Sequence, residues 1–449
     1  MSLRIVNARI VNEGRIFEGD IRIVGQRIAA IGAALPGTPG EQVIDAAGRL
    51  LLPGMIDDQV HFREPGLTHK GDLASESRAA LAGGITSFME MPNTNPLTVD
   101  AAALLDKHDR AARTSFGNWA FYFGATNDNL EAVRRVDAAL ACGVKVFMGA
   151  STGNMLVDNP ATLEGIFSGT SLLVATHCED TPTILANEAA ARARYGDAVP
   201  MREHPLIRSE ECCWKSSSLA VGLAKKHGTR LHVLHLTTAR ELALFTAGPV
   251  IDSSGVRKQI TVEACAHHLF FDDTWYDRKG ADIKCNPAIK TPADRAALIA
   301  AVNADVIDVI ATDHAPHTRA EKSRDYFNSS AGLPLVQHAL VSVLEHWHSG
   351  TMTLETIVNK TAHAPARLFD VQERGFVREG YFADLVLIDP HALAAVNDEP
   401  VYSKCGWTPF ADLVFRSRVV ATLVNGAVVD QDGVFTAGRQ AMALTFDRP

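Results

Sequence analysis

Side chains that can bind a metal ion stand in or directly after several short apolar runs of this sequence. They are histidines together with one glutamine, one lysine and one aspartate: Gln59, His61, Lys145, His177, His232, His235, Asp313, His314 and His317. Imidazole nitrogens and carboxylate oxygens are the ligands that Zn²⁺ and related ions prefer. Gln59 and His61 are two residues apart, so on an extended segment both side chains point to the same side, as two ligands of one ion must. The residue types therefore predict a metal-dependent site.

A structural interpretation competes with this one at each position taken alone. One histidine at the end of a strand usually makes a structural hydrogen bond, and Lys145 could face solvent from an alternating strand. If Lys145 instead lies among its apolar neighbours Val144, Val146 and Phe147, its amine must be neutral, modified or paired. The convergence of several such residues, rather than any single one, favours a site.

The elements that would position these side chains are eight short apolar runs. Each is followed by a longer helix-like segment rich in Ala, Leu, Glu and Arg, and the runs cover residues 52–57, 84–90, 119–124, 143–149, 172–177, 230–236, 259–264 and 306–312. Eight repeats of strand and helix over about 260 residues predict an α/β fold, a (β/α)₈ barrel of the TIM type, with active-site groups at the carboxyl ends of the strands. A doubly wound open sheet is the alternative, and the lack of a G-x-G-x-x-G after the first strand weakens it.

The two ends of the chain have a different pattern. Residues 3–50 and the segments 383–388 and 419–429 alternate apolar and polar positions between Gly and Pro turns. This period of two predicts half-buried antiparallel strands that could pair into one small β-sandwich domain built from both termini. We expect residues 1–53 plus 376–449 to form that domain and residues 54–375 to form the barrel.

Composition narrows the class of partner. The 449 residues carry a formal net charge of -9, with no run of basic residues, so nucleic acid and an anionic membrane are poor candidates and a small molecule is favoured. The seven cysteines include no C-x-x-C pair, and no window of about 18 apolar residues occurs. These features predict a soluble, cytoplasmic protein with reduced thiols.

Motifs at the ends of the runs resemble those of the amidohydrolase superfamily, and within it the cyclic amidases, above all the dihydroorotases. The resemblance covers nearly the whole chain and rests on Pro53-Gly54-Met55-Ile56-Asp57, His61-Phe62-Arg63-Glu64-Pro65-Gly66, Met91-Pro92-Asn93-Thr94-Asn95-Pro96, Val144-Lys145-Val146-Phe147, Ala175-Thr176-His177-Cys178-Glu179, His232-Val233-Leu234-His235-Leu236-Thr237-Thr238-Ala239, Lys284-Cys285-Asn286-Pro287 and Ala311-Thr312-Asp313-His314-Ala315-Pro316-His317-Thr318. It implies the same fold that the pattern of runs predicts, a barrel with a β-sandwich made from both termini.

The resemblance also implies a site that holds one or two zinc ions. His61 and Asp313 would bind the more buried ion, His177 and His235 would bind the more exposed one, and Lys145, carboxylated on its amine, would bridge the two. Carboxylation converts a buried cation into a carbamate anion that the metal ions compensate.

One residue departs from the family pattern, which has His-x-His where this chain has Gln59-Val60-His61. A glutamine oxygen is a weaker zinc ligand than imidazole, so the more buried ion would be bound less tightly, bound without Gln59, or missing. Three hypotheses follow: an active enzyme that tolerates Gln59, another cyclic amidase of the hydantoinase or allantoinase type, and a catalytically silent homologue that serves as a structural partner. The other ligand positions are intact, which favours activity.

The reaction that the resemblance implies is the reversible interconversion of L-dihydroorotate and N-carbamoyl-L-aspartate in pyrimidine biosynthesis. A metal-bound hydroxide would attack the ring amide, with Asp313 as the proton shuttle. Cys178, beside His177, is the best covalent alternative, but it would point away from the mouth if His177 points in. Family members are often dimers, so the resemblance implies a homodimer.

The substrate would be held by a further set of residues. Arg63 lies on the same face as His61 and offers two parallel donors to a carboxylate. The resemblance adds Asn93 and His317 to this carboxylate site, Asn286 to the ring, and the backbone of Ala331 and Gly332 to the amide edge. The structural alternatives are a surface salt bridge for Arg63, an Asn turn for Asn93 and a helix-start hydrogen bond for His317.

One charged segment and one pair of histidines lie near these motifs in the sequence. Residues 318–330 are charged and lack apolar periodicity, so they form either a mobile lid over the mouth or a solvated loop. His267 and His268 follow the seventh run, where we expect them to support the site rather than to bind metal.

Overall fold

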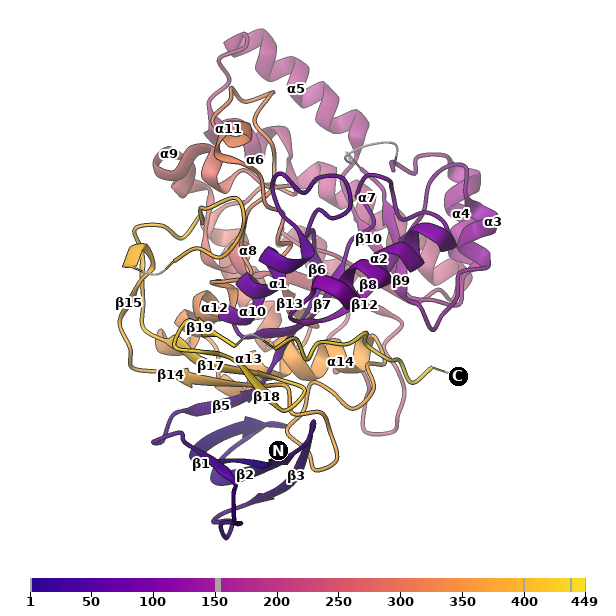
Figure 1. Ribbon diagram of the computed structural model, residues 1–449. Helices are drawn as coiled ribbons and strands as arrows, with labels where there is room; N and C mark the ends of the chain where they lie inside the picture. The colour runs from indigo at the N-terminus through magenta and orange to yellow at the C-terminus, as the bar shows by residue number, and fades with distance from the viewer. Residues whose placement is uncertain (1, 150–154, 399, 437, 449) are drawn as a thin grey trace.

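The computed structural model describes residues 2–149, 155–398, 400–436 and 438–448. Within them, eight parallel strands form one sheet in chain order (Figure 1). The strands are β6 (Met55–Val60), β7 (Ile85–Glu90), β8 (Asn118–Gly124), β9 (Ala141–Phe147), β10 (Val174–His177), β11 (Leu231–Val233), β12 (Ile260–Cys265) and β13 (Val309–Ala311). The chain after β13 returns to β6, because Val60 bridges to His314 and the His61 N–H donates to the His314 carbonyl at 2.7 Å. The sheet thus closes, and the predicted barrel is confirmed.

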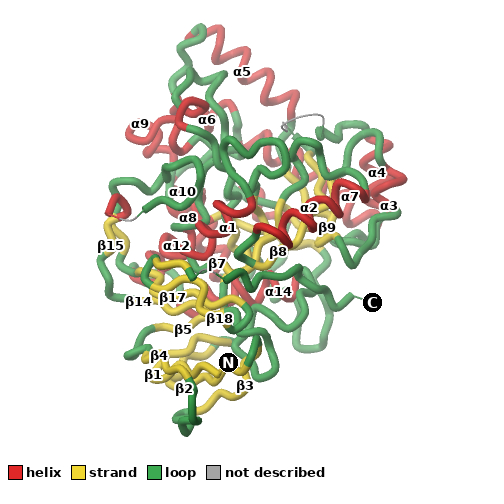
Figure 2. The backbone as a smooth tube through the Cα atoms, viewed as in Figure 1, coloured by secondary structure: helices red, strands yellow, loops and turns green. Residues whose placement is uncertain are grey.

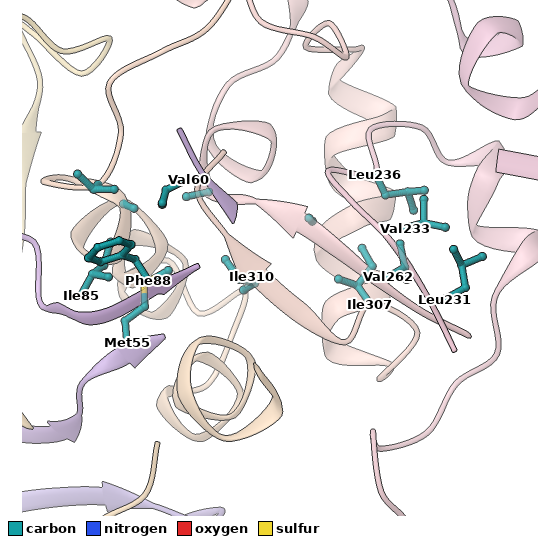
Figure 3. Close-up of a cluster of buried hydrophobic side chains, with 14 of the residues drawn as sticks. Met55, Val60, Ile85, Phe88, Leu231, Val233, Leu236, Val262, Ile307 and Ile310 are labelled. Atoms are coloured by element: carbon teal, nitrogen blue, oxygen red, sulfur yellow. The ribbon is translucent and has the colours of Figure 1, made fainter. Parts of the chain in front are cut away.

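Helices cover the outside of the barrel. The longer ones are α1 (Leu73–Ala82), α2 (Ala101–Thr114), α4 (Pro160–Gly169), α5 (Thr181–Tyr195), α7 (Glu210–His227), α10 (Pro292–Asn303) and α12 (Ala339–His348). One buried apolar cluster joins strand residues such as Val60, Phe88 and Ile310 to residues of the helices. Figure 3 shows part of it, with Phe88 beside Ile85 at one end and Val233 near Val262 at the other. Burial on both faces explains why the strands read as continuous apolar runs.

The strand and helix repeat is less regular than predicted. Only the five-residue helix α3 (Leu130–Arg134) separates β8 from β9, and β11 is followed by a 3₁₀ turn, η2 (Arg240–Leu244), instead of an α-helix. Gly248 and Pro249 come soon after this turn, and Pro disfavours helix in the residue before it. The expectation of a longer helix is wrong at these two places.

A glycine divides the first apolar run between two sheets. Leu52 and Pro53 belong to β5 (Leu50–Pro53), whereas the barrel begins at Met55. A Cβ at Gly54 would lie 2.1 Å from the Thr86 hydroxyl, so only glycine fits where the chain passes from one sheet into the other. The predicted first barrel strand therefore begins three residues too early.

The second sheet draws its strands from both ends of the chain. It contains β1 (Ser2–Asn12), β2 (Arg15–Val24), β3 (Arg27–Gly32), β4 (Gln42–Asp45), β5, β14 (Leu385–Asp389), β17 (Arg418–Val424), β18 (Ala427–Gln431) and β19 (Val434–Phe435). Antiparallel pairing of β5 with β14, for example Leu51 opposite Leu387, joins the two ends. Figure 2 shows these strands beneath the barrel. The sandwich built from both termini is confirmed, while the boundaries at residues 53 and 376 stay a prediction.

The pairing of this sheet is mixed, although the sequence predicted antiparallel strands. β1 pairs in parallel with both β4 and β5, and antiparallel with β2. Parallel pairing follows because the chain crosses back through residues 33–41 before β4, and β5 then continues along the same edge of β1 after residues 46–49. Local alternation of apolar residues carries no information about such a crossing.

A buried polar seam connects the two sheets below the barrel. Arg374 pairs with Asp384 and donates from Nη1 to Asn425 Oδ1 at 2.7 Å. Asn118, the first residue of β8, donates from Nδ2 to Asp384 Oδ2 at 3.1 Å. The seam lies at the amino end of β8, the side of a barrel that contributes to stability rather than catalysis.

No helix among the described residues is both long enough and apolar enough to span a lipid bilayer.

Candidate active site

A cavity of about 410 Å³ opens where the barrel strands end at their carboxyl sides. The twelve residues to which the resemblance gives a catalytic, metal-binding or substrate-binding role all line it: Gln59, His61, Arg63, Asn93, Lys145, His177, His235, Asn286, Asp313, His317, Ala331 and Gly332. His232 and His314 do not line it. Its other lining residues are Lys70, Phe147, Arg208, Ala315 and Ser330. The fold thus brings the predicted set together, and the roles of its members stay predictions.

His177 and His235 form the first ligand-like pair. His177 Nδ1 lies 2.9 Å from His235 Nε2, and both residues are buried. On its other side, His177 donates from Nε2 to Glu179 Oε2 at 3.0 Å, which leaves Nδ1 as a lone pair. Two ring nitrogens aimed at one point, one of them fixed by a buried carboxylate, are the arrangement that a zinc ion requires.

Glu179 is itself held by a residue that the sequence did not single out. Arg208, between α6 (His204–Ile207) and α7, pairs with Glu179 Oε2. Burial opposes ionisation of Glu179, but Arg208 and His177 outweigh it and lower its pKa to about 2. The spacing of His177 and Glu179, two residues apart, could have suggested the pair, whereas Arg208 comes from a loop with no comparable signal.

His61 and Asp313 form the second pair, with 3.2 Å between His61 Nε2 and Asp313 Oδ1. His61 Nδ1 lies 2.7 Å from Asn93 Oδ1, so Nδ1 carries the proton and Nε2 presents its lone pair to the cavity. Burial lowers the pKa of His61, although Asp313 acts in the opposite direction. A neutral imidazole with a free Nε2 is suited to bind a metal ion.

Gln59 faces Asp313 through its amide nitrogen. Gln59 Nε2 donates to Asp313 Oδ1 at 3.1 Å, and the Cys265 thiol lies 3.8 Å from Gln59 Oε1. The structure thus places Gln59 beside the second pair.

Lys145 lies inside the barrel mouth, and its alternative placement in solvent is wrong. The residue is 1% exposed on β9, with Nζ 4.6 Å from the centre of the Phe147 ring. Burial lowers the pKa of its amine to about 8. At neutral pH a larger fraction of this amine is unprotonated than in a surface lysine, so the amine is more reactive.

A cationic corner occupies one side of the cavity. Arg63 Nη2 lies 3.1 Å from His317 Nε2, and Lys70 Nζ lies 3.2 Å from His317 Nδ1. Glu321 Oε1 lies 3.2 Å from Lys70 Nζ, so the Glu321 carboxylate pairs with the Lys70 cation of this corner. Burial and then Arg63 lower the pKa of His317 to about 3, which keeps it neutral. Arg63 is 5% exposed, so a surface salt bridge is excluded.

Lys70 is a lining residue that sequence reasoning missed. It lies seven residues after Arg63 in the loop Leu67-Thr68-His69-Lys70, which has no periodicity that would indicate its direction. Only the three-dimensional path of this loop brings its ammonium to His317.

Asn286, Ala331 and Gly332 also line the cavity, and Ala331 lies next to His317. Asn286 Oδ1 is buried and has no protein hydrogen-bond partner among the described residues. The Ala331 carbonyl lies 3.1 Å from His317 Nε2, and the Gly332 N–H donates to the Lys284 carbonyl at 2.9 Å. The Gly332 amide hydrogen is therefore used within the protein, whereas the resemblance implies that the backbone of Ala331 and Gly332 meets the substrate.

The segment 318–330 is folded rather than a plain solvated loop. It begins with helix α11 (Arg319–Lys322), whose capping box joins Thr318 and Glu321. The Lys322 ammonium is buried and donates to the carbonyls of Lys284, Ser330 and Gly332 at 2.9–3.1 Å. This anchors both ends of the segment to the rim, and lid motion stays a prediction.

Among the described residues, two clusters of ligand-type side chains lie outside the set that lines the cavity. His232 lies 3.2 Å from Asp58 and 3.3 Å from Glu263, all fully buried. Burial opposes its protonation, but the two carboxylates outweigh burial and raise the pKa of His232 to about 9. A protonated histidine thus accounts for this cluster without a metal ion. The second cluster, Cys265 with His267 and His268, is also buried.

Cys178 is not placed as a nucleophile. Its thiol donates to the Thr176 hydroxyl at 3.3 Å, and burial raises its pKa to about 11. It lies outside the cavity lining, so the covalent alternative loses its support.

The backbone is unusual at three lining residues. Arg63, His235 and Asp313 have φ values of 73°, 41° and 51°, in the left-handed region that residues other than glycine rarely adopt. Strained backbone of this kind clusters at functional sites, where the surrounding structure enforces it.

Comparisons with known proteins agree with this geometry. A sequence model described as "Amidohydrolase family" matches residues 50–429. A dihydroorotase of Halobacterium salinarum is 35% identical over 430 residues, covering 95% of this chain and 96% of that protein. An allantoinase of Solibacter usitatus is 32% identical over 433 residues, covering 94% and 92%.

Solved structures extend the likeness to the whole fold. An L-hydantoinase (dihydropyrimidinase) from Arthrobacter aurescens superposes with a TM-score of 0.91 at 26% identity, covering 99% of each chain. A dihydropyrimidinase from Brevibacillus agri has a TM-score of 0.87 at 23% identity and covers 100% of each.

Proposed function

This chain belongs to the amidohydrolase family and is a hydrolase of cyclic amides, and we propose that the amide it opens and closes is that of L-dihydroorotate, with N-carbamoyl-L-aspartate as the other partner. The observation that carries this proposal is the cationic corner of Arg63, His317 and Lys70 in the same cavity as the His177–His235 pair. Dihydroorotate has one carboxylate on a ring whose amide must reach the metal. A cavity that holds both a cation and ligands for a metal ion matches that substrate.

The metal ion that we propose is zinc. Its ligands would be the imidazoles of His177, His235 and His61, the Asp313 carboxylate and Lys145 as its carbamate. The fit rests on the lone pairs of His177 Nδ1 and His61 Nε2, each fixed by a hydrogen bond on the opposite ring nitrogen. Bound zinc would supply a Lewis acid for the ring carbonyl and would lower the pKa of water to about 7.

Lys145 is the residue that carbamate formation would change. CO₂ adds to a neutral amine, and burial lowers the pKa of this amine to about 8. The resulting anion would lie in the cavity that His177, His235, His61 and Asp313 line, so a metal ion would balance its charge.

Asp313 would move the proton. Its Oδ1 accepts from Gln59, which leaves Oδ2 to take the proton of the attacking water and deliver it to the leaving ring nitrogen. The same carboxylate would return the proton in the direction of ring closure.

Arg63 and Asn93 would hold the substrate carboxylate. Arg63 uses Nε for the Pro316 carbonyl and Nη2 for His317, and the remaining donors of its fork suit a carboxylate. Asn93 Oδ1 accepts a hydrogen bond from His61, so Asn93 Nδ2 can donate a hydrogen bond to the substrate carboxylate.

Allantoinase is the second candidate, because a relative of that name is 32% identical over nearly the whole chain. Allantoin and hydantoin carry no carboxylate on the ring, so Arg63 and Lys70 would remain without a substrate anion. The charge of the corner favours dihydroorotate and, with it, a place in pyrimidine biosynthesis.

The test is a comparison of three substrates on the zinc-loaded protein. We expect kcat/KM for dihydroorotate to exceed that for hydantoin and for allantoin. Arg63→Gln should lower kcat/KM for dihydroorotate on the order of 100-fold, since it removes a buried cation that pairs with the substrate anion.

Arg319→Gln is the matched control for charge near the mouth. Arg319 is half exposed and pairs with Asp282, so this change should leave turnover within about twofold. Faster turnover of hydantoin or allantoin than of dihydroorotate would contradict the proposal.

A further inference from the structure

Gln59 stands where a metal ligand would, yet its amide is turned the wrong way to bind a cation. The side chain is 1% exposed, and its Nε2 lies 3.1 Å from Asp313 Oδ1. Its Oε1 faces the thiol of Cys265 at 3.8 Å. An amide nitrogen donates hydrogen bonds and has no free lone pair, so in this orientation Gln59 cannot coordinate an ion.

The neighbours of Gln59 on both sides select this orientation. The Asp313 carboxylate only accepts hydrogen bonds, whereas the Cys265 thiol can donate one. A flipped amide would place Oε1 against Asp313 Oδ1, two acceptors in contact, and would leave the thiol opposite a donor. In a buried site two acceptors in contact are unfavourable, so the Asp313 carboxylate favours the orientation with Nε2 toward it.

The other member of the pair keeps a geometry suited to a metal ion. His61 presents Nε2 to the cavity 3.2 Å from the same Asp313 oxygen, because Asn93 takes its Nδ1 proton. Two acceptors at this distance are stable only with a cation between them or with an added proton. The more buried position therefore retains His61, Asp313 and Lys145 as ligands and lacks a fourth.

Building on the proposed function, we propose that Gln59 is a positioning residue and not a metal ligand. Its N–H holds Asp313 in the orientation that proton transfer needs, and the more buried of two zinc ions is bound by three protein groups. With the bridging Lys145 counted for both, each position has three protein groups, but the position of His177 and His235 has two imidazoles, one of them fixed by Glu179, where the other has one. We therefore expect the ion at His177 and His235 to be held more tightly than the ion at His61 and Asp313.

The experiment counts zinc in the purified protein with a competing chromophoric chelator and needs no substrate. The wild type should bind one zinc tightly and a second at least about 10-fold more weakly. Gln59→His, which adds an imidazole, should strengthen the weaker site by about 10-fold or more. Gln59→Leu should leave the tighter site within about threefold and should weaken the other site clearly less than His61→Gln does, because Gln59 orients a ligand whereas His61 is one.

A second measurement separates positioning from a purely structural effect. In zinc-saturated protein, Gln59→Leu should lower kcat on the order of 10-fold while KM stays within about twofold, since proton transfer and not substrate binding is disturbed. Thermal unfolding of the variant shows whether it is folded.

A loss of the second zinc in Gln59→Leu as large as in His61→Gln would overturn the inference, because it would make Gln59 a ligand. Two equally tight ions in the wild type would overturn it as well. If the protein prefers hydantoin to dihydroorotate, the proposed function fails while the zinc count stands.

Discussion

At the scale of single residues, buried carboxylates set the direction of the histidines in the cavity. Glu179 takes the Nε2 proton of His177, and Glu263 accepts from the backbone N–H of His235 at 3.0 Å. Each contact fixes a group that the proposed metal ion would use. Such partners commonly tune metal affinity as strongly as the choice of ligand itself.

Replacement of Glu179 tests this support. Glu179→Gln should weaken zinc binding by about 10- to 100-fold, because the neutral amide no longer fixes the His177 ring or balances Arg208. Competition with a chelator measures the affinity. Glu131→Gln, at an exposed position on α3, should leave it unchanged, and an unchanged affinity in Glu179→Gln would remove the supporting role.

Prediction from sequence succeeded for residues whose position on a strand fixes their direction. Gln59 and His61 share a face because they are two apart, and Lys145 lies in an apolar run that the fold buries. Lys70 and Arg208 reach the cavity from loops, whose paths depend on packing that no local pattern encodes. The orientation of the Gln59 amide depends on Cys265 and Asp313, both more than 200 positions away along the chain.

At the scale of elements, one charged cluster ties three barrel strands together beneath the cavity. Asp58 on β6, His232 on β11 and Glu263 on β12 are fully buried and share protons. Burial raises the pKa of Glu263 to about 7, and the two carboxylates raise that of His232 to about 9 against the effect of burial. The folded cluster therefore holds protons that the unfolded chain would release.

The sign of the pH dependence follows from these shifts. A histidine with a folded pKa of about 9 contributes stability that is fully present below its usual pKa of about 6.5 and is lost as the pH rises through 9. We expect the free energy of unfolding of the metal-free protein, measured by urea denaturation, to fall between pH 6.5 and 9.5. In His232→Gln this slope should flatten, and an equal slope in both proteins would contradict the assignment.

The anchored segment 318–330 shows a second way in which elements position the site. Helix α11 is only four residues long, yet Lys322 connects it to the carbonyls of Lys284, Ser330 and Gly332. The sequence reveals the polarity of this segment but not the burial of Lys322, which depends on the distant Lys284. A charged run is thus compatible with a fixed wall of the cavity.

At the scale of the whole molecule, the barrel and the second sheet share a buried polar seam. Arg374, Asp384, Asn425 and Asn118 are all buried and hydrogen-bonded to one another. A buried ion pair contributes little net stability when intact, but removal of one partner leaves an uncompensated charge. The seam therefore couples the folding of the two sheets.

Removal of the cation measures that coupling. Arg374→Met should lower the free energy of unfolding by about 3–5 kcal/mol, because Asp384 would be left buried and unpaired. Arg378→Met removes a comparable guanidinium whose pair with Glu13 is partly exposed, and it should cost less than about 1 kcal/mol. Equal effects of the two changes, measured by thermal or urea unfolding, would contradict a special role for the seam.

The barrel could be predicted because each of its strands is a local apolar run, and eight of them leave few other architectures. The parallel pairing of β1 with β4 and β5 could not, since it depends on where the chain crosses back. The predicted start of the first barrel strand was wrong because the chain leaves one sheet and enters the other at Gly54.

The pairing of β5 with β14 also has a consequence for synthesis on the ribosome. Strand β5 ends at Pro53, but its partner β14 begins only at Leu385, so more than 300 residues must be translated between them. At about 5–20 residues per second, the open edge of β5 waits for tens of seconds. During that time the edge of β5 that later pairs with β14 is exposed and can pair with a wrong strand. Molecular chaperones that shield nascent chains would matter most at this edge.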